Sequence, residues 1–253
     1  MARYYRRRYP KAYGTRYRSN RRIKGLYRTS SMYSIKGAAR RFIGKYKLRQ
    51  ALSSIAEHKY FENGVTLGPT AGAQLNSTGS LLLITDVAQG AGQTNRIGDK
   101  ATGTSLEMKY ELIFPGLATT NPINTARIIV FIWKDDTVPA VVDILEDPTY
   151  PSLSPFNHDK KVKRKILYDK TINQYGLYSA VATQSFADSQ RPNVTYSVYI
   201  PLGKLKRYCN IYYQSGTTVG VNNIYCLAIA ENNGAANTTW SFQSYTRYNF
   251  IDM

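Results

Sequence analysis

The chain has 253 residues, with 34 Lys and Arg against 16 Asp and Glu, so its formal net charge is +18. It contains no apolar run of the roughly 18 residues that a membrane helix needs, and no apolar stretch typical of a secretory signal follows its first residues. We therefore expect no membrane span and no signal peptide.

The positive charge is concentrated at one end of the chain. Residues 1–56 hold 17 Lys and Arg and no acidic residue, whereas residues 57–253 hold 17 basic and 16 acidic residues. This division predicts a basic Arg/Tyr-rich arm at 1–56, attached to a nearly neutral body at 57–253 that is long enough to bury a core.

The composition of the arm is typical of nucleic-acid binding. Each Lys or Arg that contacts a phosphate releases condensed counterions, and Tyr rings between them offer faces on which unpaired bases can stack. A nuclear localisation signal or a merely solvated tail are the alternatives, but a localisation signal needs only about five to eight basic residues. The residues that we predict to bind nucleic acid are Arg3, Tyr4, Tyr5, Arg6, Arg7, Arg8, Arg16, Tyr17, Arg18, Arg21, Arg22, Lys24, Arg28, Arg40, Arg41, Lys45 and Lys47.

The pattern of the arm changes near residue 35. Ile35, Ala39, Phe42, Ile43 and Tyr46 recur at helical spacing, and most basic residues fall on other faces. These positions indicate an amphipathic helix within 35–55. Such a helix could lie on nucleic acid, on a membrane surface or in a partner's groove, and we favour nucleic acid.

The body is dominated by alternation with a period of two residues. In 104–114, apolar side chains alternate with Glu107, Lys109 and Glu111, which predicts a half-buried strand. Two other segments, 126–133 and 222–231, are almost wholly apolar, as expected of strands covered on both faces. The complete set of predicted strands is 80–87, 104–114, 126–133, 165–172, 193–201, 209–214, 222–231 and 240–250.

These elements predict an all-β fold, an eight-stranded antiparallel jelly-roll sandwich. Turn-forming residues separate the strands, and no strong helical pattern lies between them. The longest gap, 135–164, is predicted to be a connection with one helical turn near 141–145. An immunoglobulin-like sandwich is the alternative, but it predicts shorter and more even loops.

Three charged segments of the body are candidate contacts between subunits. "RIGDK" (96–100) could form such a contact, a contact with the genome, or only a local turn capped by its Asp. The acidic segment 134–147 could bind Ca²⁺ or be a solvated loop. The basic segment 158–166 could bind nucleic acid or pair with a neighbour's acidic loop. The possible interface residues are Arg96, Asp99, Asp135, Asp136, Lys160, Lys161, Lys163 and Arg164.

No catalytic or metal-binding motif is apparent, so we predict no enzyme activity, no cofactor and no metal. The two histidines, His58 and His158, are isolated from each other, and no phosphate-binding loop motif occurs. Cys209 and Cys226 lie in apolar strand-like segments and are predicted to be buried thiols rather than a disulfide.

Several segments, taken in order, resemble a known family. After the basic arm come "EHKYF" (57–61), "QGAGQTNRIGDKATGTSLEMKYEL" (89–112), "RIIVFIWKDD" (127–136), "SPFN" (154–157), "ILYDKTI" (166–172) and "YIPLGK" (199–204). Together they resemble the jelly-roll capsid proteins of small circular, Rep-encoding single-stranded DNA viruses (CRESS DNA viruses). Within that group they are most similar to members whose capsids are like that of satellite tobacco necrosis virus.

The resemblance implies a homo-oligomeric icosahedral shell of the smallest (T=1) kind, with about sixty copies. The arm would bind a packaged single-stranded DNA genome, or RNA when the protein is expressed alone. The arm would also contact a host import receptor, so the protein would occur in the virion and, during assembly, in the host nucleus. The alternative is a cellular RNA- or DNA-binding β-protein, such as a ribosomal protein.

Overall fold

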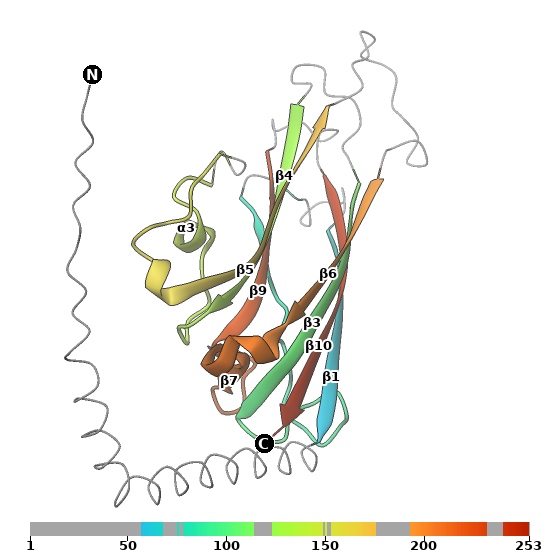
Figure 1. The fold of residues 1–253 in the computed structure, drawn as a ribbon, viewed down its shortest axis with the longest axis vertical. Coiled ribbons are helices and arrows are strands. Elements are labelled where there is room, and N and C mark those ends of the chain that lie inside the picture. Colours follow the sequence, from blue (N-terminus) through green and yellow to red (C-terminus); the bar gives the residue numbers. More distant parts are fainter. Residues whose placement is uncertain are drawn as a thin grey trace, which may run out of the picture. The chain divides into compact units, whose positions relative to one another are not determined.

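A computed structural model describes residues 57–67, 75, 78–113, 123–148, 150, 153–175, 193–231 and 240–252. The predicted arm, with its helix at 35–55, lies outside the described residues, as does Phe114 at the end of a predicted strand. The described strands form two antiparallel sheets that face each other (Figure 1).

Each sheet contains four main strands. The first sheet has the order β1 (His58–Leu67), β10 (Ser241–Asp252), β3 (Lys100–Ile113), β6 (Asn193–Pro201), and β7 (Asn210–Tyr213) and β8 (Gly220–Val221) continue it beside the start of β3. The second has the order β2 (Ser80–Leu83), β9 (Asn223–Ala230), β4 (Ile123–Trp133), β5 (Arg164–Tyr175).

The path of the chain through the two sheets is that of a jelly roll. The chain passes from β1 to β2, from β3 to β4, from β5 to β6 and from β9 to β10 by changing sheet each time. A late strand, β10 or β9, therefore separates two early strands in each sheet, which is the arrangement of interlocked Greek keys. The predicted all-β jelly roll is confirmed, and the immunoglobulin-like alternative is wrong.

The main core lies between the two sheets. On β3, Leu106, Met108, Tyr110 and Leu112 are all at most 1% exposed, as the alternation in the sequence predicts. They face the second sheet, and from β10 the inward side chains Trp240, Phe242, Tyr248 and Phe250 join the same cluster. The hydroxyl groups of Tyr110 and Tyr168 hydrogen-bond across this core at 2.9 Å.

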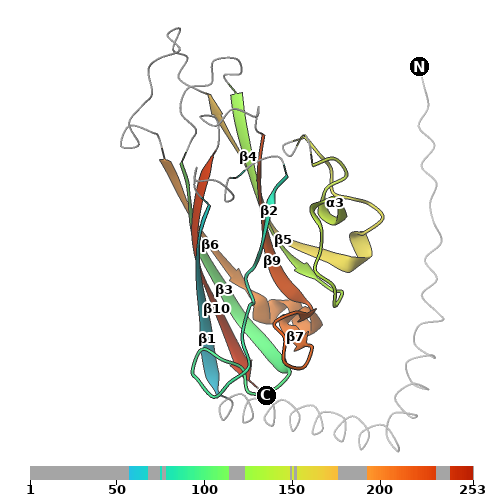
Figure 2. The same cartoon turned by 180° about the vertical axis from the view of Figure 1, so that it is seen from behind.

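A second, smaller core covers the outer face of the second sheet. Ile129, Phe131 and Trp133 of β4 point away from the first sheet, toward the connection between β4 and β5. This connection holds α3 (Val141–Ile144) and the short 3₁₀ helix η1 (Lys161–Lys163), and its Ile144 and Leu145 are fully buried in the second core. Figure 2 shows α3 on the side of the second sheet opposite to the first sheet. Strands β4 and β9 are therefore covered on both faces, as their apolar sequences predict, and the single helical turn occurs where we expected it.

One main strand was not predicted. β1 reads "HKYFENGVTL", and its Asn63-Gly64 pair is the commonest signal for a tight hairpin turn. Its pairing with the whole of β10, from His58–Ile251 to Leu67–Phe242, overrides that local preference. The predicted strand at 209–214 is instead the short β7, the strand predicted at 80–87 ends at Leu83, and the 3₁₀ helix η3 (Leu202–Cys209) was not expected.

Neither cysteine forms a disulfide. Cys226 is 1% exposed in the main core, where burial raises the pKa of its thiol to about 12. Cys209 is only half-buried, at the end of η3. The prediction of two buried thiols is therefore confirmed for Cys226 and too strong for Cys209.

A single glycine permits the pairing of β7 and β8. A Cβ atom at Gly220 would lie 2.2 Å from the carbonyl oxygen of Tyr212 and 2.6 Å from the Cα of Tyr213. Because both are backbone atoms, they cannot yield by changing a rotamer. We expect Gly220→Ala to lower the free energy of unfolding by about 1–3 kcal/mol, as overpacking does. Gly203→Ala is the control, since nothing lies within 4 Å of its Cβ position. Urea denaturation of both variants measures this difference, and equal midpoints would contradict it.

Candidate assembly and nucleic-acid surfaces

The nucleic-acid-binding residues predicted in the arm all lie outside the described residues, and they stay predictions. The described residues begin at Glu57, whose carbonyl oxygen accepts a hydrogen bond from the backbone of Asp252 at 3.3 Å. The first and last described residues therefore lie at the paired ends of β1 and β10, where Figure 1 also marks the C-terminus.

A buried ion pair links these two strand ends. The ammonium of Lys59 has no exposed surface, and it lies 3.2 Å from Asp252 Oδ2 and 3.0 Å from the carbonyl oxygen of Asn95. The same carboxylate oxygen accepts the backbone N–H of Ile97. Sequence reasoning missed this pair. Once β1 is known, Lys59 is recognisable because it shares the inward face of the strand with the apolar Phe61 and Val65.

Arg96 is buried within the subunit. It is 0% exposed, and its guanidinium donates to the carbonyl oxygens of Val87, Gly98 and Thr217 and to the Asp99 carboxylate. It also stacks 4.3 Å from the centre of the Tyr213 ring. A side chain with no exposed surface cannot contact a neighbouring subunit, so the predicted interface role of Arg96 is wrong. The local-turn interpretation accounts for it, whereas Asp99, with a half-exposed side chain, remains a proposed contact.

Part of the predicted charge pairing occurs inside one subunit. The Lys163 ammonium binds the Asp135 carboxylate, and Lys160 lies 3.9 Å from Asp143. The hydrogen bond from Lys163 lowers the pKa of Asp135 from its ordinary value and raises that of Lys163. The basic and acidic segments thus partly neutralise each other. Asp136 keeps an exposed carboxylate, while its carbonyl oxygen accepts from Gln214.

The remaining two predicted interface residues line a pocket on the outer side of the second sheet. Lys161 and Arg164 lie there with Phe156, His158 and Ile166, around a cavity of about 450 Å³. Lys161 is exposed, whereas Arg164 is only 7% exposed. The prediction grouped them with Lys160 and Lys163, which do not line this pocket and instead lie beside Asp143 and Asp135.

The connection between β4 and β5 also carries much of the exposed apolar surface. Of the nine large apolar side chains that are exposed among the described residues, five belong to this connection, namely Val138, Val142, Tyr150, Leu153 and Val162. Leu153 and Val162 are 80% and 81% exposed. Apolar surface of this kind on an otherwise polar protein is typical of contacts between proteins.

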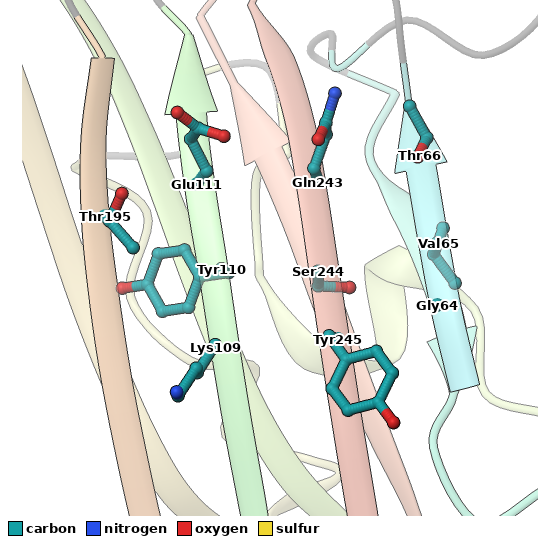
Figure 3. A pocket seen from close by; sticks show the side chains of 10 residues that line it. All are labelled: Gly64, Val65, Thr66, Lys109, Tyr110, Glu111, Thr195, Gln243, Ser244 and Tyr245. Carbon is teal, nitrogen blue, oxygen red and sulfur yellow. The ribbon is translucent and has the colours of Figure 1, made fainter. Parts of the chain in front are cut away.

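The outer face of the first sheet has a different character. A shallow hollow of about 390 Å³ lies across β1, β10, β3 and β6. Figure 3 shows the side chains that line it, among them Lys109, Glu111, Thr195, Gln243 and Tyr245 on neighbouring strands. Nearby, Arg247 pairs with Glu62 across β10 and β1. Charges of both signs alternate on this face, so it is not a basic surface suited to binding a phosphate backbone.

The described residues contain no group of three or more His, Cys, Asp or Glu side chains that could hold a metal ion. Among the helices in the described part of the chain, none has the length and apolar composition needed to span a membrane.

No family model matches this sequence, and no curated protein matches it. Solved structures of viruses and of one viral capsid protein show a weak similarity to the chain. The chain is 8% identical to a protein of Desmodium yellow mottle tymovirus, with 78% of this chain and 88% of that chain covered and a TM-score of 0.32. For Cocksfoot mottle virus the identity is 11%, the coverage 76% and 94%, and the TM-score 0.32. For the decameric BFDV capsid protein the identity is 11%, the coverage 78% and 97%, and the TM-score 0.29.

Proposed function

We propose that this chain is a viral capsid protein whose jelly-roll body assembles into a closed shell and whose arm binds a packaged single-stranded DNA genome. The observation that carries the proposal is the separation of charge. The 17 basic residues of 1–56 have no acidic neighbour, while the rest of the chain is within one charge of neutral. Such a chain can bind phosphate at one end and pack against copies of itself through the other.

Burial makes the surface of the body even less basic than its composition suggests. Four of its cations, Lys59, Arg96, Arg127 and Arg164, are at most 7% exposed. A cellular nucleic-acid-binding β-protein, such as a ribosomal protein, needs exposed basic residues on its folded domain to follow a phosphate backbone. The body is a poor candidate for that role, which favours the shell.

The size of the arm's charge suits a small shell. About sixty copies with 17 positive charges each carry roughly a thousand charges, which is the order needed for a single-stranded genome of about one to two kilobases. We propose the smallest icosahedral shell on this basis. An import receptor that binds the same basic residues would bring the protein to the host nucleus for assembly, and RNA could replace DNA when the protein is expressed alone.

We propose that subunit contacts involve the connection between β4 and β5, with its exposed Leu153 and Val162, and the charged side chains Asp99, Asp136 and Lys160. Burying the apolar side chains would supply a non-directional driving force, and the charges would select the register.

Sedimentation velocity with a nuclease treatment tests the proposed function. The purified full-length protein should sediment as one large species whose nucleic acid survives nuclease. A slowly sedimenting monomer that loses its nucleic acid to nuclease would favour the cellular binding protein instead.

Binding by the arm should depend steeply on salt. Because each phosphate contact releases condensed counterions, the affinity of the full-length protein for a single-stranded oligonucleotide should fall by about a thousandfold between 50 and 200 mM salt. Fluorescence anisotropy at several salt concentrations measures the slope. A flat response would indicate base-specific contacts in place of phosphate neutralisation.

A further inference from the structure

The pocket that the β4–β5 connection forms with β5 contains an arginine that has no ion pair with any described residue. Arg164 opens β5 and is 7% exposed. Within the part of the chain that the structure describes, its guanidinium makes one hydrogen bond, a long one of 3.3 Å to the carbonyl oxygen of Asp143, and it forms no ion pair. A guanidinium offers five N–H donors, so most of the hydrogen-bonding capacity of Arg164 is unused.

A second buried arginine on the same sheet, Arg127, has hydrogen-bond acceptors for its guanidinium and serves as a comparison. Arg127 is also 7% exposed, but its Nε and Nη2 bind both oxygens of Asp169 at 2.9 and 2.8 Å, and Nη1 donates to the carbonyl oxygen of Ser154. Both guanidinium groups lie against the ring of Phe156, at 5.0 Å for Arg127 and 5.4 Å for Arg164. The two arginines therefore have similar burial and the same aromatic neighbour, but only Arg127 binds a carboxylate among the described residues.

Leaving a buried guanidinium without an anion is costly. Burial lowers the pKa of Arg164 from its ordinary value, and the carboxylate of Glu146 opposes this effect only in part. Glu146 itself accepts a hydrogen bond from the backbone N–H of His158. An anion that entered the pocket would supply the missing partner.

The rest of the pocket is suited to one kind of anion. Lys161, in η1, and His158, in the turn before it, line the opening with donors that approach from a different element than Arg164. A tetrahedral oxyanion directs its acceptor oxygens in three dimensions, whereas the two oxygens of a carboxylate lie in one plane. Phe156 and Ile166 form apolar walls, and the cavity of about 450 Å³ leaves room for more than the anion itself.

We propose that this pocket binds a phosphate group, carried by a nucleotide or free in solution. Arg164 and Lys161 bind the phosphate oxygens, His158 adds a ring N–H donor, and Phe156 and Ile166 contact the sugar or base of a nucleotide. The residues that line the pocket all belong to the described part of the chain, so this inference does not depend on the proposed role of the arm.

Isothermal titration of the full-length protein tests the site, with inorganic phosphate and thymidine 5′-monophosphate as probes at constant ionic strength. Arg164→Gln should weaken both probes by about tenfold and Lys161→Gln by about threefold, because each removes a charge-assisted hydrogen bond. Lys170→Gln is the matched control, since it removes an exposed lysine from the same strand but outside the pocket. The arm is identical in all of these proteins, so its own phosphate binding cancels.

The outcomes separate the possible sources of the anion. Tighter binding of the nucleotide than of phosphate, lost in both pocket variants, indicates a nucleotide site; equal binding, also lost in both, indicates a site for phosphate alone. Either result supports the proposal. Two results would overturn it: pocket variants that bind both probes as well as the Lys170→Gln control does, or acetate that competes as well as phosphate, which points to a protein carboxylate. Should Arg164→Gln fail to fold by circular dichroism, the exposed Lys161→Gln decides.

Discussion

A protein that lacks residues 1–34 should keep its folded body and lose its nucleic acid. The deletion removes 11 of the 17 basic residues of the arm, whereas the described fold begins only at residue 57. Since the counterion effect grows with each phosphate contact, we expect the affinity for a single-stranded oligonucleotide to fall by at least about a hundredfold at low salt. The circular dichroism and thermal melting of the body should stay unchanged. Fluorescence anisotropy and absorbance at 260 and 280 nm of the purified protein provide the readouts.

The matched control keeps the charge and changes the side chains. A full-length variant in which every Arg of 1–34 is replaced by Lys should still package nucleic acid, because phosphate neutralisation needs charge and little geometry. Loss of packaging in this control would show that the arginines make specific contacts. Full genome loading in the deletion variant would contradict the role of the arm altogether.

Arg96→Ala should destabilise the body more than any exposed charge substitution. The guanidinium of Arg96 satisfies the carbonyl oxygens of Val87, Gly98 and Thr217 and packs on Tyr213. Removing it leaves buried acceptors without donors and opens a cavity in the connection between β2 and β3. We expect the free energy of unfolding to fall by about 3–5 kcal/mol.

Arg247→Ala is the control for this substitution. Arg247 pairs with Glu62 on the exposed outer face of the first sheet, and exposed ion pairs contribute about 0–1 kcal/mol. Urea denaturation compares the two variants on the same protein. Equal midpoints would mean that the network around Arg96 contributes little to the stability of the body.

Most strands of the body were predictable because burial acts directly on the sequence pattern. The alternation of Leu106, Met108, Tyr110 and Leu112 reflects a strand with one buried face. The continuous apolar run of β4 reflects a strand that is buried on both faces. β1 was missed because Asn63 and Gly64 favour a turn locally, and only the long pairing with β10 makes them part of a strand. Local sequence carries no information about that distant partner.

The charged sites were harder to predict for the same reason. The sequence shows that Arg96 precedes Asp99 and that Lys160 to Lys165 are rich in charge, but it does not show which of them are buried. The structure places Arg96 inside, pairs Lys163 with Asp135, and leaves Arg164 buried without an ion pair to any described carboxylate. These differences depend on the paths of the β2–β3 and β4–β5 connections, and no periodic pattern in the sequence specifies those paths.

Negative-stain electron microscopy of the purified full-length protein, with absorbance at 260 and 280 nm on the same fraction, tests the central claim most directly. We expect uniform round particles whose absorbance shows nucleic acid that nuclease does not remove. A protein that binds nucleic acid but forms no particles under any assembly condition would contradict the proposed shell and favour a cellular nucleic-acid-binding protein.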